Sequence, residues 1–414
     1  MKYLLATAFL LATAAQASAQ VRPTGYISTF VGVFPHADRP VGPSGVVSPF
    51  RRTVDIRARA FAEQKLTPVD WMRVTLSGFA EGLVGRRSDR SVEDAIVRVQ
   101  DASVELIGRR VDLLAGFTRV AWGRLDELQP TDVINPLDVS RFFFEGRSEA
   151  RLPVALARAR WFLTDDVTLE GVVVPVFRRG RFDQLDEPTS PFNLVSLPVE
   201  QVEPHRDLSG GARFSATTGR VDWSVSAFRG FEPFGAYVPR SAARSVAQVF
   251  SRFSMFGGDF ETVRGRWGIR GEVAAFTEDT FQDVIGPVGG RSFDAGVGAD
   301  LKAGDYRVSG TALFHRERYD RPIQSAEGFE TGRTDLSLIA SAERSFARET
   351  YSVRLFGVYA TTEGSLFARS IATAKLRDNL ALEGSIGWFF GDGRDLIGRF
   401  SDSDFVYARL KYYF

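Results

Sequence analysis

Hydrophobic and polar residues alternate with a period of two in many segments of this chain, each about ten residues long. The last segment, residues 405–414, shows the pattern clearly. From Val406 onward every second residue is apolar, while Arg409 and Lys411 lie between the apolar positions. Successive side chains of a β-strand point to opposite faces, so such a segment predicts a strand with one apolar and one polar face. The alternation therefore predicts an all-β protein.

The same alternation recurs along the chain and predicts further strands of this kind. It is found over residues 54–62, 72–81, 155–162, 267–275, 293–302, 351–359 and 380–390. Near Gln100 to Ser103 the alternation slips by one residue, which predicts a β-bulge, the insertion of one extra residue into a strand.

The connections between these segments alternate between short and long. Short turns rich in the Gly, Asn and Asp that tight hairpins need lie at 108–110, 164–166, 218–220, 304–305 and 378–379. Long connections lie at 36–49, 122–149, 178–208, 232–244, 278–290 and 318–332. Short periplasmic turns on one rim and long extracellular loops on the other are typical of bacterial transmembrane barrels.

We therefore predict a transmembrane antiparallel β-barrel of about 18 strands, an even number that places both chain ends on the short-turn side. The alternative is about 16 strands, because the first strand and the 250–277 hairpin are hard to delimit. A barrel of either size has a water-filled lumen. The mean hydropathy of −0.10 agrees with one face in lipid and one in water.

Residues 1–19 have the features of a cleaved secretory signal peptide. A positive start at Lys2 precedes a short apolar run, and Ala17-Ser18-Ala19 forms a small-x-small cleavage site. The apolar run is shorter than the roughly 20 residues that a membrane-spanning helix needs. We expect the mature chain, residues 20–414, to form a single barrel in the outer membrane of a Gram-negative bacterium.

Composition excludes several classes of function. The 52 basic and 51 acidic residues give a net charge of +1, which does not indicate nucleic-acid binding. The absence of cysteine excludes disulfides, thiolate metal sites and a cysteine nucleophile. The three histidines, His36, His205 and His315, do not share a predicted strand, so no histidine-based active site is predicted. We expect no enzymatic activity, no metal and no cofactor.

One long connection, residues 122–149, is unlike the rest of the chain. Pro130 and Pro136 exclude a regular strand, while its many apolar residues argue against a free linker. A loop of this length inside a compact domain is usually functional. We expect it to fold into the lumen and to present four acids to the opening, Asp126, Glu127, Asp132 and Asp138. The alternative is an external loop that caps the mouth of the barrel.

The polar faces of the predicted strands carry more arginines than acids. The candidate pore residues there are Arg57, Arg59, Arg73, Arg158 and Arg160, and the same faces carry Arg98, Arg270, Arg354, Arg369 and Arg409. A cationic wall opposite an acidic loop would create a transverse field, and side-chain charges of this kind set ion selectivity in pores. The alternative is a ladder of ion pairs that only fills a wide lumen, with each pair contributing about 0–1 kcal/mol.

A resemblance to a known family rests on residues 120–138, which read VAWGRLDELQPTDVINPLD. The Trp-Gly pair and the Ile-Asn-Pro-x-Asp segment resemble a motif of an uncharacterised porin-superfamily group, which more distantly resembles alginate-export-type barrels. The terminal Phe414 resembles the C-terminal strand signal of Gram-negative outer-membrane proteins. The resemblance implies a large porin-like barrel, linked to export or uptake of bulky or apolar compounds, and it supplies no catalytic residue.

These observations predict an outer-membrane channel for facilitated diffusion of small or medium solutes, anionic or dipolar because wall arginines outnumber wall acids. The alternative is a barrel specific for an oligosaccharide or a hydrophobic compound that moves along aromatic side chains. Such a track could include Phe61, Phe228, Phe276, Phe356, Phe389, Phe405, Tyr407 and Tyr413. A non-conducting surface or structural barrel is a third class. Expected partners are outer-membrane lipid, lipopolysaccharide and the solute, with a homotrimer expected by analogy with porins.

Overall fold

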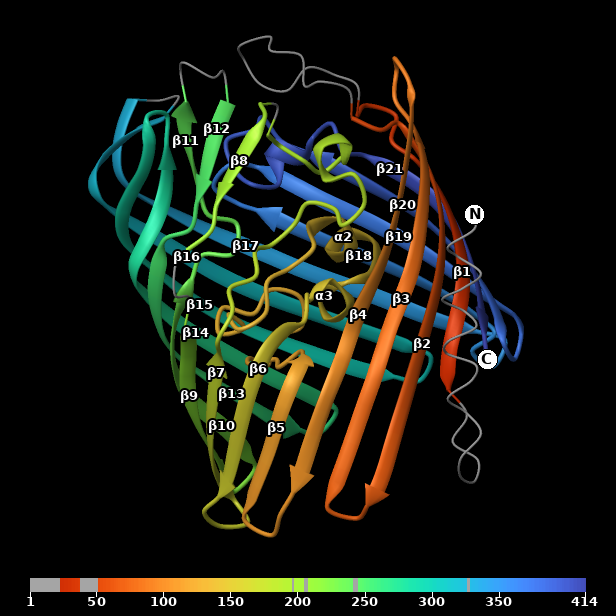
Figure 1. Ribbon diagram of the computed structural model, residues 1–414, viewed down its shortest axis with the longest axis vertical. Helices are drawn as coiled ribbons and strands as arrows, with labels where there is room; N and C mark the ends of the chain where they lie inside the picture. Colours follow the sequence, from red (N-terminus) through yellow and green to blue (C-terminus); the bar gives the residue numbers. More distant parts are fainter. Residues whose placement is uncertain (1–22, 38–50, 196, 205–207, 241–244, 326–327) are drawn as a thin grey trace.

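The computed structural model describes residues 23–37, 51–195, 197–204, 208–240, 245–325 and 328–414 (Figure 1). Within them, 18 strands form one closed antiparallel sheet. The prediction of an all-β transmembrane barrel of about 18 strands is therefore confirmed, and the alternative of 16 strands is excluded. The signal peptide predicted over residues 1–19 lies outside the described residues.

Each strand of the barrel pairs with its neighbours along the chain. The strands are β1 (Thr24–Val33), β2 (Val54–Val69), β3 (Met72–Arg86), β4 (Ser91–Ile107), β5 (Val111–Thr118), β6 (Val154–Phe162), β7 (Val167–Val174), β9 (Ser209–Thr218), β10 (Val221–Phe231), β13 (Arg252–Arg264), β14 (Trp267–Asp283), β15 (Gly286–Ala303), β16 (Tyr306–Ser325), β17 (Gly328–Phe346), β18 (Tyr351–Ala360), β19 (Ser365–Arg377), β20 (Leu380–Phe390) and β21 (Phe405–Tyr413). Pairing of β1 with β21 closes the barrel. Closure leaves no free sheet edge, so the backbone groups of the strands pair with one another, as a lipid environment requires.

The predicted alternation of faces is present in the strands. On β21, Val406 and Leu410 point outward and are exposed, whereas Phe405 and Tyr407 are buried in the barrel interior. Val297 on β15 is likewise apolar and exposed. Outward apolar side chains of this kind form the belt that a barrel presents to lipid. No helix among the described residues is long and apolar enough to cross a membrane.

The short turns lie where the sequence predicted them. Gly219 and Gly304 occupy two of these turns with φ of 63° and 62°, a conformation that favours glycine. The predicted β-bulge is also confirmed. Ser77 of β3 pairs with Asp101 of β4 and Gly78 pairs with Val99, so Gln100 is the extra residue.

Two of the predicted long connections, at 278–290 and 318–332, are wrong. Strands β14 and β15 continue as a paired hairpin to Asp283 and Gly286, and β16 and β17 also extend through the second region. The glycines that suggested loops instead permit close packing between strands. A Cβ on Gly290 would lie 2.2 Å from the carbonyl oxygen of Arg318 on the neighbouring strand.

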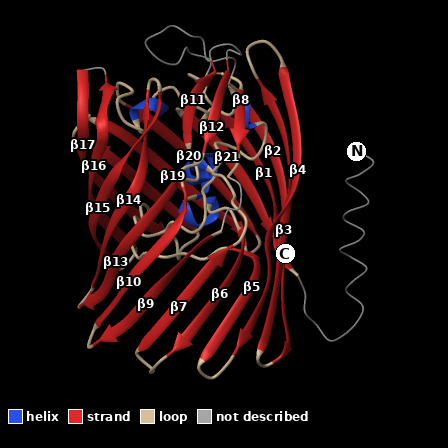
Figure 2. Ribbon diagram, turned by 60° about the vertical axis from the view of Figure 1, so that its left-hand side comes forward, coloured by secondary structure: helices blue, strands red, loops and turns tan. Residues whose placement is uncertain are grey.

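Several short elements lie outside the barrel sheet. These are the helices α2 (Val139–Glu145) and α3 (Arg147–Ala150), the 3₁₀ turns η2 (Glu187–Thr189) and η4 (Gly398–Phe400), and a small sheet of β8 (Val199–Val202), β11 (Ala236–Arg240) and β12 (Ser245–Val249). Both helices lie inside the barrel, between its front and back walls, and the small sheet lies at the long-loop rim (Figures 1 and 2).

The hydrophobic core of the molecule lies inside the barrel, where the segments that connect the strands pack against the inner surface of the barrel wall. One cluster joins Phe143 and Phe144 of α2 to Phe192 and to the wall residues Phe389 and Phe405. The ring centroids of Phe143 and Phe389 are 4.9 Å apart in an edge-to-face arrangement. A second cluster, against the opposite wall, consists of Val120, Trp122, Ile134, Val154, Leu156, Val172, Val174, Phe228, Phe253, Met255 and Ala274. The lumen is therefore partly filled by packed side chains.

Candidate functional site

The connection between β5 and β6, here called the inner loop (residues 119–153), contacts the far wall of the barrel. Arg270 of β14 donates a hydrogen bond to Asp126 Oδ1 at 2.8 Å. Arg354 of β18 donates to Glu127 Oε1 at 2.9 Å. Two of the acids predicted at the pore are thus paired with two wall arginines across the lumen.

The carboxylate of Glu272 on β14 anchors the inner loop to the wall. It accepts hydrogen bonds from the backbone N–H groups of Arg124, Leu125 and Thr131, and from the Thr131 hydroxyl at 3.0 Å. Gly123, with φ of 90°, allows this close approach, because a Cβ there would lie 2.8 Å from Glu272 Oε1. The carboxylate is 2% exposed, so these donors take the place of water around its charge.

Asp132 and Asn135 tie the two ends of the inner loop together. Asp132 Oδ2 accepts a hydrogen bond from Arg151 Nε at 2.7 Å. Asn135 Oδ1 accepts from the backbone N–H of Val120, and its Nδ2 donates to the carbonyl of Leu152, both at 2.8 Å. The Ile-Asn-Pro-x-Asp segment therefore closes the loop on itself, which gives the Asn a structural role.

Asp138 caps the N-terminus of α2. Its Oδ1 accepts hydrogen bonds from the backbone N–H of Arg141 at 3.2 Å and from the Ser140 hydroxyl at 2.8 Å. Burial, and to a lesser degree the nearby charge of Asp183, raise the pKa of Asp138 to about 6. Asp132 and Asp138 are 6% and 1% exposed. The expectation that these two acids face the opening is therefore wrong, because both are buried within the loop.

The predicted pore arginines separate into two groups. Arg57 donates to Asp183 Oδ2 at 2.8 Å and is buried. Arg59 bridges Glu81 of the wall and Glu145 of α2, at 2.9 and 2.8 Å. This first group holds the inner loop and the segment after β7 against β2 and β3.

The second group of arginines surrounds one carboxylate on the wall of β3 to β6. Arg73, Arg158 and Arg160 lie 3.0, 3.3 and 3.3 Å from Glu105. Arg160 also pairs with Asp112 at 3.0 Å. Three guanidinium groups around two acids leave a positive excess on this part of the wall.

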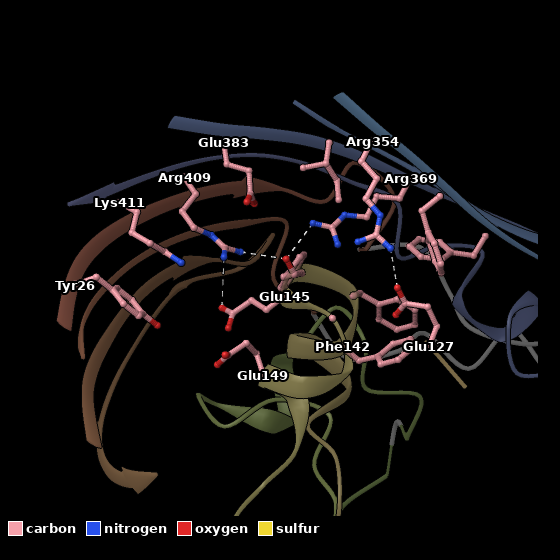
Figure 3. Close-up of a pocket in the computed structure, with 16 residues that line it drawn as sticks. Tyr26, Glu127, Phe142, Glu145, Glu149, Arg354, Arg369, Glu383, Arg409 and Lys411 are labelled. Atoms are coloured by element: carbon pink, nitrogen blue, oxygen red, sulfur yellow. Dashed lines mark hydrogen bonds and ion pairs between the residues drawn. The ribbon is translucent and has the colours of Figure 1, made fainter. Parts of the chain in front are cut away.

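A cavity of about 300 Å³ lies between α2 and the wall formed by β1 and β18–β21 (Figure 3). Its wall side bears the cations Arg354, Arg369, Arg409 and Lys411 and one acid, Glu383, and its loop side bears Glu127, Phe142, Glu145 and Glu149. Figure 3 shows these two sets of side chains pointing toward each other. We call this cavity the charged slot, because four cations and one carboxylate line its wall side and only carboxylates supply the charge of its loop side.

The charges of the slot are held in place by the end of α2. Arg369 and Arg409 both donate to the carbonyl oxygen of Phe144, at 3.0 and 3.4 Å. Cations are favoured at this helix end, where carbonyl groups point outward. Although burial opposes it, the guanidinium groups, with Arg59 foremost, hold the pKa of Glu145 well below its usual range. Glu145 is therefore ionised at neutral pH.

Four charged groups of the slot, Arg369, Glu383, Lys411 and Glu149, make no ion pair among the described residues. Arg369 and Glu383 both hydrogen-bond to the Tyr407 hydroxyl. Lys411 Nζ lies 4.5 Å from the ring centroid of Tyr26, a cation–π contact. Glu149 is exposed and has no hydrogen-bond partner in the described part of the chain. Lys411 and Glu149 stand on opposite sides of the slot and are accessible to a solute.

The sequence predicts the cationic side of the slot but little of its acidic side. Arg354, Arg369 and Arg409 were expected on the polar faces, whereas Glu145 and Glu149 were not singled out. Asp138 is a residue type that favours the N-cap position, and this could have predicted a helix after it. The helix that begins there has Glu145 in its last turn.

The described residues form neither a metal site nor a histidine–serine pair. No group of three histidine, aspartate or glutamate side chains there could hold a metal ion. His36 contacts Asp404 at 3.1 Å, and His315 contacts Asp294 and Glu317 at 2.7 and 2.9 Å. Both histidines are ion-pair partners in this arrangement, and neither contacts a serine hydroxyl.

Comparison with known proteins supports the fold. No family model matches the sequence, and no curated protein is similar to it. Acinetobacter baumannii OccAB4 superposes with a TM-score of 0.53 at 10% identity, over 95% of this chain and 98% of that chain. Pseudomonas aeruginosa OccK11 (OpdR) gives a TM-score of 0.47 at 13% identity, over 95% of each chain. OmpT, an outer membrane protein of Vibrio cholerae, gives 0.46 at 11% identity, over 96% and 99%.

The closed 18-stranded sheet and the similarity to OccAB4 define the fold as a porin-like β-barrel. An identity of 10% shows the fold alone. The relation of the Trp-Gly and Ile-Asn-Pro-x-Asp segments to a particular porin group, and to alginate-export-type barrels, stays a prediction.

Replacement of Glu272 by alanine tests the anchor of the inner loop. The Glu272→Ala variant loses the acceptor for three backbone N–H groups, so we expect the free energy of unfolding to fall by about 2–4 kcal/mol. Hydrogen exchange at the backbone N–H groups of Arg124, Leu125 and Thr131 in the folded protein should become faster. The matched control is Glu105→Ala, a luminal carboxylate that pairs with wall arginines only. Equal exchange at these three groups in the wild type and Glu272→Ala would contradict the anchor.

The pKa of Asp138 predicts a dependence of stability on pH. The folded protein holds the Asp138 proton more tightly than the unfolded chain does, because the folded pKa of about 6 is raised. The wild type should therefore lose about 1–3 kcal/mol, relative to Asp138→Asn, as pH rises from about 4 to about 6. Asparagine also caps helices, so this variant keeps the cap and removes the titration. Denaturant midpoints across this range give the difference, and a constant difference would refute the raised pKa.

Proposed function

We propose that this protein is an outer-membrane channel for facilitated diffusion of small or medium solutes that are anionic or dipolar. The observation that supports this most is the charged slot inside a closed barrel. Its wall side carries Arg354, Arg369, Arg409 and Lys411 with the single acid Glu383, and its loop side carries Glu127, Glu145 and Glu149. Rings and ladders of side-chain charge are the means by which pores select ions.

The arrangement of charges in the slot would act on a passing solute through its field. Opposite charges on two walls of a narrow space produce a field across the pore, and low-dielectric walls strengthen it. A dipolar solute lowers its energy by aligning with this field. Because Glu145 is held by Arg59 at 2.8 Å and Arg354 is held by Glu127 at 2.9 Å, the field is preorganised.

The proposed preference for anions rests on luminal cations that make no ion pair. Lys411 makes no ion pair among the described residues, and Arg98, exposed on the luminal face of β4, makes none either. Arg73, Arg158 and Arg160 outnumber the two acids with which they pair. The lumen therefore offers an anion several cations that are not already neutralised.

The alternative of transport along an aromatic track has less support. Phe389, Phe405 and Tyr407 belong to the packed cluster around α2, and Phe228 belongs to the second cluster. Rings that are buried beneath the inner loop cannot offer their faces to a passing sugar or lipid. Phe142 and Phe356 do line the charged slot, and we expect them to add apolar contacts to a solute that the charges orient.

The proposed location follows from the fold and the N-terminal segment together. We propose that residues 1–19 are a cleaved signal peptide and that residues 20–414 insert into the outer membrane, with the short turns in the periplasm. The inner loop then enters the lumen from the extracellular side. The expected homotrimer stays a prediction, which the mass of the detergent-purified protein tests.

Reversal of the Lys411 charge tests the proposed selectivity. In planar bilayers under a salt gradient, we expect the wild-type reversal potential to show anion preference. The Lys411→Glu variant should lower the anion-to-cation permeability ratio by about twofold or more, because it removes an unpaired cation from the slot. Lys411 holds no structural ion pair among the described residues, so the variant should fold.

Arg348→Glu is the matched control for this measurement. It makes a similar change of charge at an exposed turn on the short-turn rim, outside the slot. Its permeability ratio should stay at the wild-type value. The absence of any conductance in the wild type, or equal ratios in the wild type and Lys411→Glu, would refute the proposed function.

A further inference from the structure

We propose that the outer face of β15 and β16 carries a binding site for the phosphate groups of an anionic lipid headgroup. The site consists of Arg291, Arg316 and Arg318, three exposed arginines immediately beyond the apolar belt on the long-loop side. The inference rests on the proposed membrane location and is independent of whether the barrel conducts.

Strand register places the three arginines together on the lipid side of the barrel. Arg291 of β15 pairs directly with Arg318 of β16, and Phe293 pairs with Arg316. Residues that are directly opposite in antiparallel strands have side chains on the same face, with Cβ atoms about 5 Å apart. Phe293 is exposed and alternates in phase with the outward Val297, so all three arginines also point outward.

The apolar belt ends where this arginine cluster begins. Outward residues of β15 from the other rim are Leu301, Ala299, Val297, Ala295 and Phe293, and those of β16 are Tyr306, Val308, Gly310, Ala312 and Phe314. The next outward positions are Arg291 and Arg316, followed by Arg318 on β16. The cluster therefore lies at the height where lipid headgroups meet the apolar belt.

No ion pair with a described residue neutralises the positive charge of the three arginines. None of the three arginine side chains makes a hydrogen bond or an ion pair with a described residue. Like charges directly opposite in a sheet are destabilising, so an unoccupied cluster of this kind costs free energy. Asp320 is two positions beyond Arg318 on the same strand and makes no ion pair among the described residues. The nearest acid on β14, Glu278, is already paired with Arg229 at 3.2 Å.

The neighbouring strands place small residues and hydroxyl groups beside the three arginines. Arg291 pairs with Thr277 of β14 on one side. On the other side, Arg316 and Arg318 pair with Thr334 and Gly332 of β17. Both threonines are exposed. Three guanidinium groups flanked by small residues and two hydroxyls form a shallow outward cradle of hydrogen-bond donors.

The chemistry and position of the cradle indicate a phosphorylated amphiphile. Guanidinium groups bind phosphate oxygens in bidentate fashion, which gives Arg an advantage over Lys at such sites. An amphiphile bound here would also place its acyl chains on the belt below, against Phe314 and Leu336. Free phosphate gains nothing from this belt. In an outer leaflet of lipopolysaccharide, the matching ligand is the phosphorylated lipid A portion.

The test compares the full-length wild type in detergent with a variant that carries Arg291→Gln, Arg316→Gln and Arg318→Gln. Binding of bisphosphorylated lipid A is measured for each protein, and we expect roughly tenfold or greater weakening in the variant. The control replaces Arg109, Arg110 and Arg348, exposed arginines of the short-turn rim, by glutamine. It changes the net charge by the same amount and should bind like the wild type.

Two further arms identify the ligand. The wild type should bind dephosphorylated lipid A as weakly as the variant does, and inorganic phosphate should not displace the intact lipid. Equal affinity of the wild type and the variant would overturn the site. Displacement by inorganic phosphate would show an anion site that does not require lipid, and would overturn the lipid assignment.

Channel measurements on the same variant separate this inference from the proposed function. We expect unchanged single-channel conductance, because the arginines lie outside the lumen, together with unchanged heat-modifiable migration as a sign of folding. Loss of lipid binding in a barrel that never conducts would support the site and refute the channel. Intact lipid binding in a conducting variant would refute the site and support the channel.

Discussion

Every charge that the inner loop buries inside the barrel needs a partner, and the rest of the interior depends on this constraint. A charged group that is removed from water and left unpaired costs several kcal/mol. The loop meets the requirement with Glu272 at its entry, Asp132 within it and Arg59 opposite its helix. The buried carboxylate of Glu272, which accepts backbone N–H groups, fixes where the loop crosses the lumen. The aromatic cluster around Phe143 then packs the remaining space.

The same constraint explains why the charged slot is where it is. Most luminal charges, such as those of Arg57 and Asp138, already interact with other groups of the protein. These charges can interact only weakly with a passing solute. The slot is the place where α2 stops short of the wall and its last residues face a row of cations. Lys411 and Glu149 keep their charges accessible there. Charged groups that form ion pairs or hydrogen bonds within the protein position the loop. The few charged groups without such partners can interact with the solute.

The barrel could be predicted from the sequence because its strands obey one local rule. Alternation gave the inward and outward faces, and a single slip in phase located the bulge at Gln100. The extended β14–β17 hairpins were missed because the glycines near Gly290 resemble turn signals while in fact permitting close strand contact. The charged slot could be predicted only in part. Strand phase identifies Arg354 and Arg409, but the positions of Asp132 and Glu145 depend on the path of a loop, which has no periodicity.

The most direct test of this account asks whether solute passes through the charged slot. The chain contains no cysteine, so Glu149→Cys would introduce a single thiol beside the slot. Modification of this thiol with a bulky, charged methanethiosulfonate during single-channel recording should reduce the current in one discrete step. The same reagent on Glu349→Cys, at an exposed turn of the short-turn rim, should leave the current unchanged. Complete modification of Glu149→Cys with an unchanged current would contradict the account, because the conducting path would then bypass the slot.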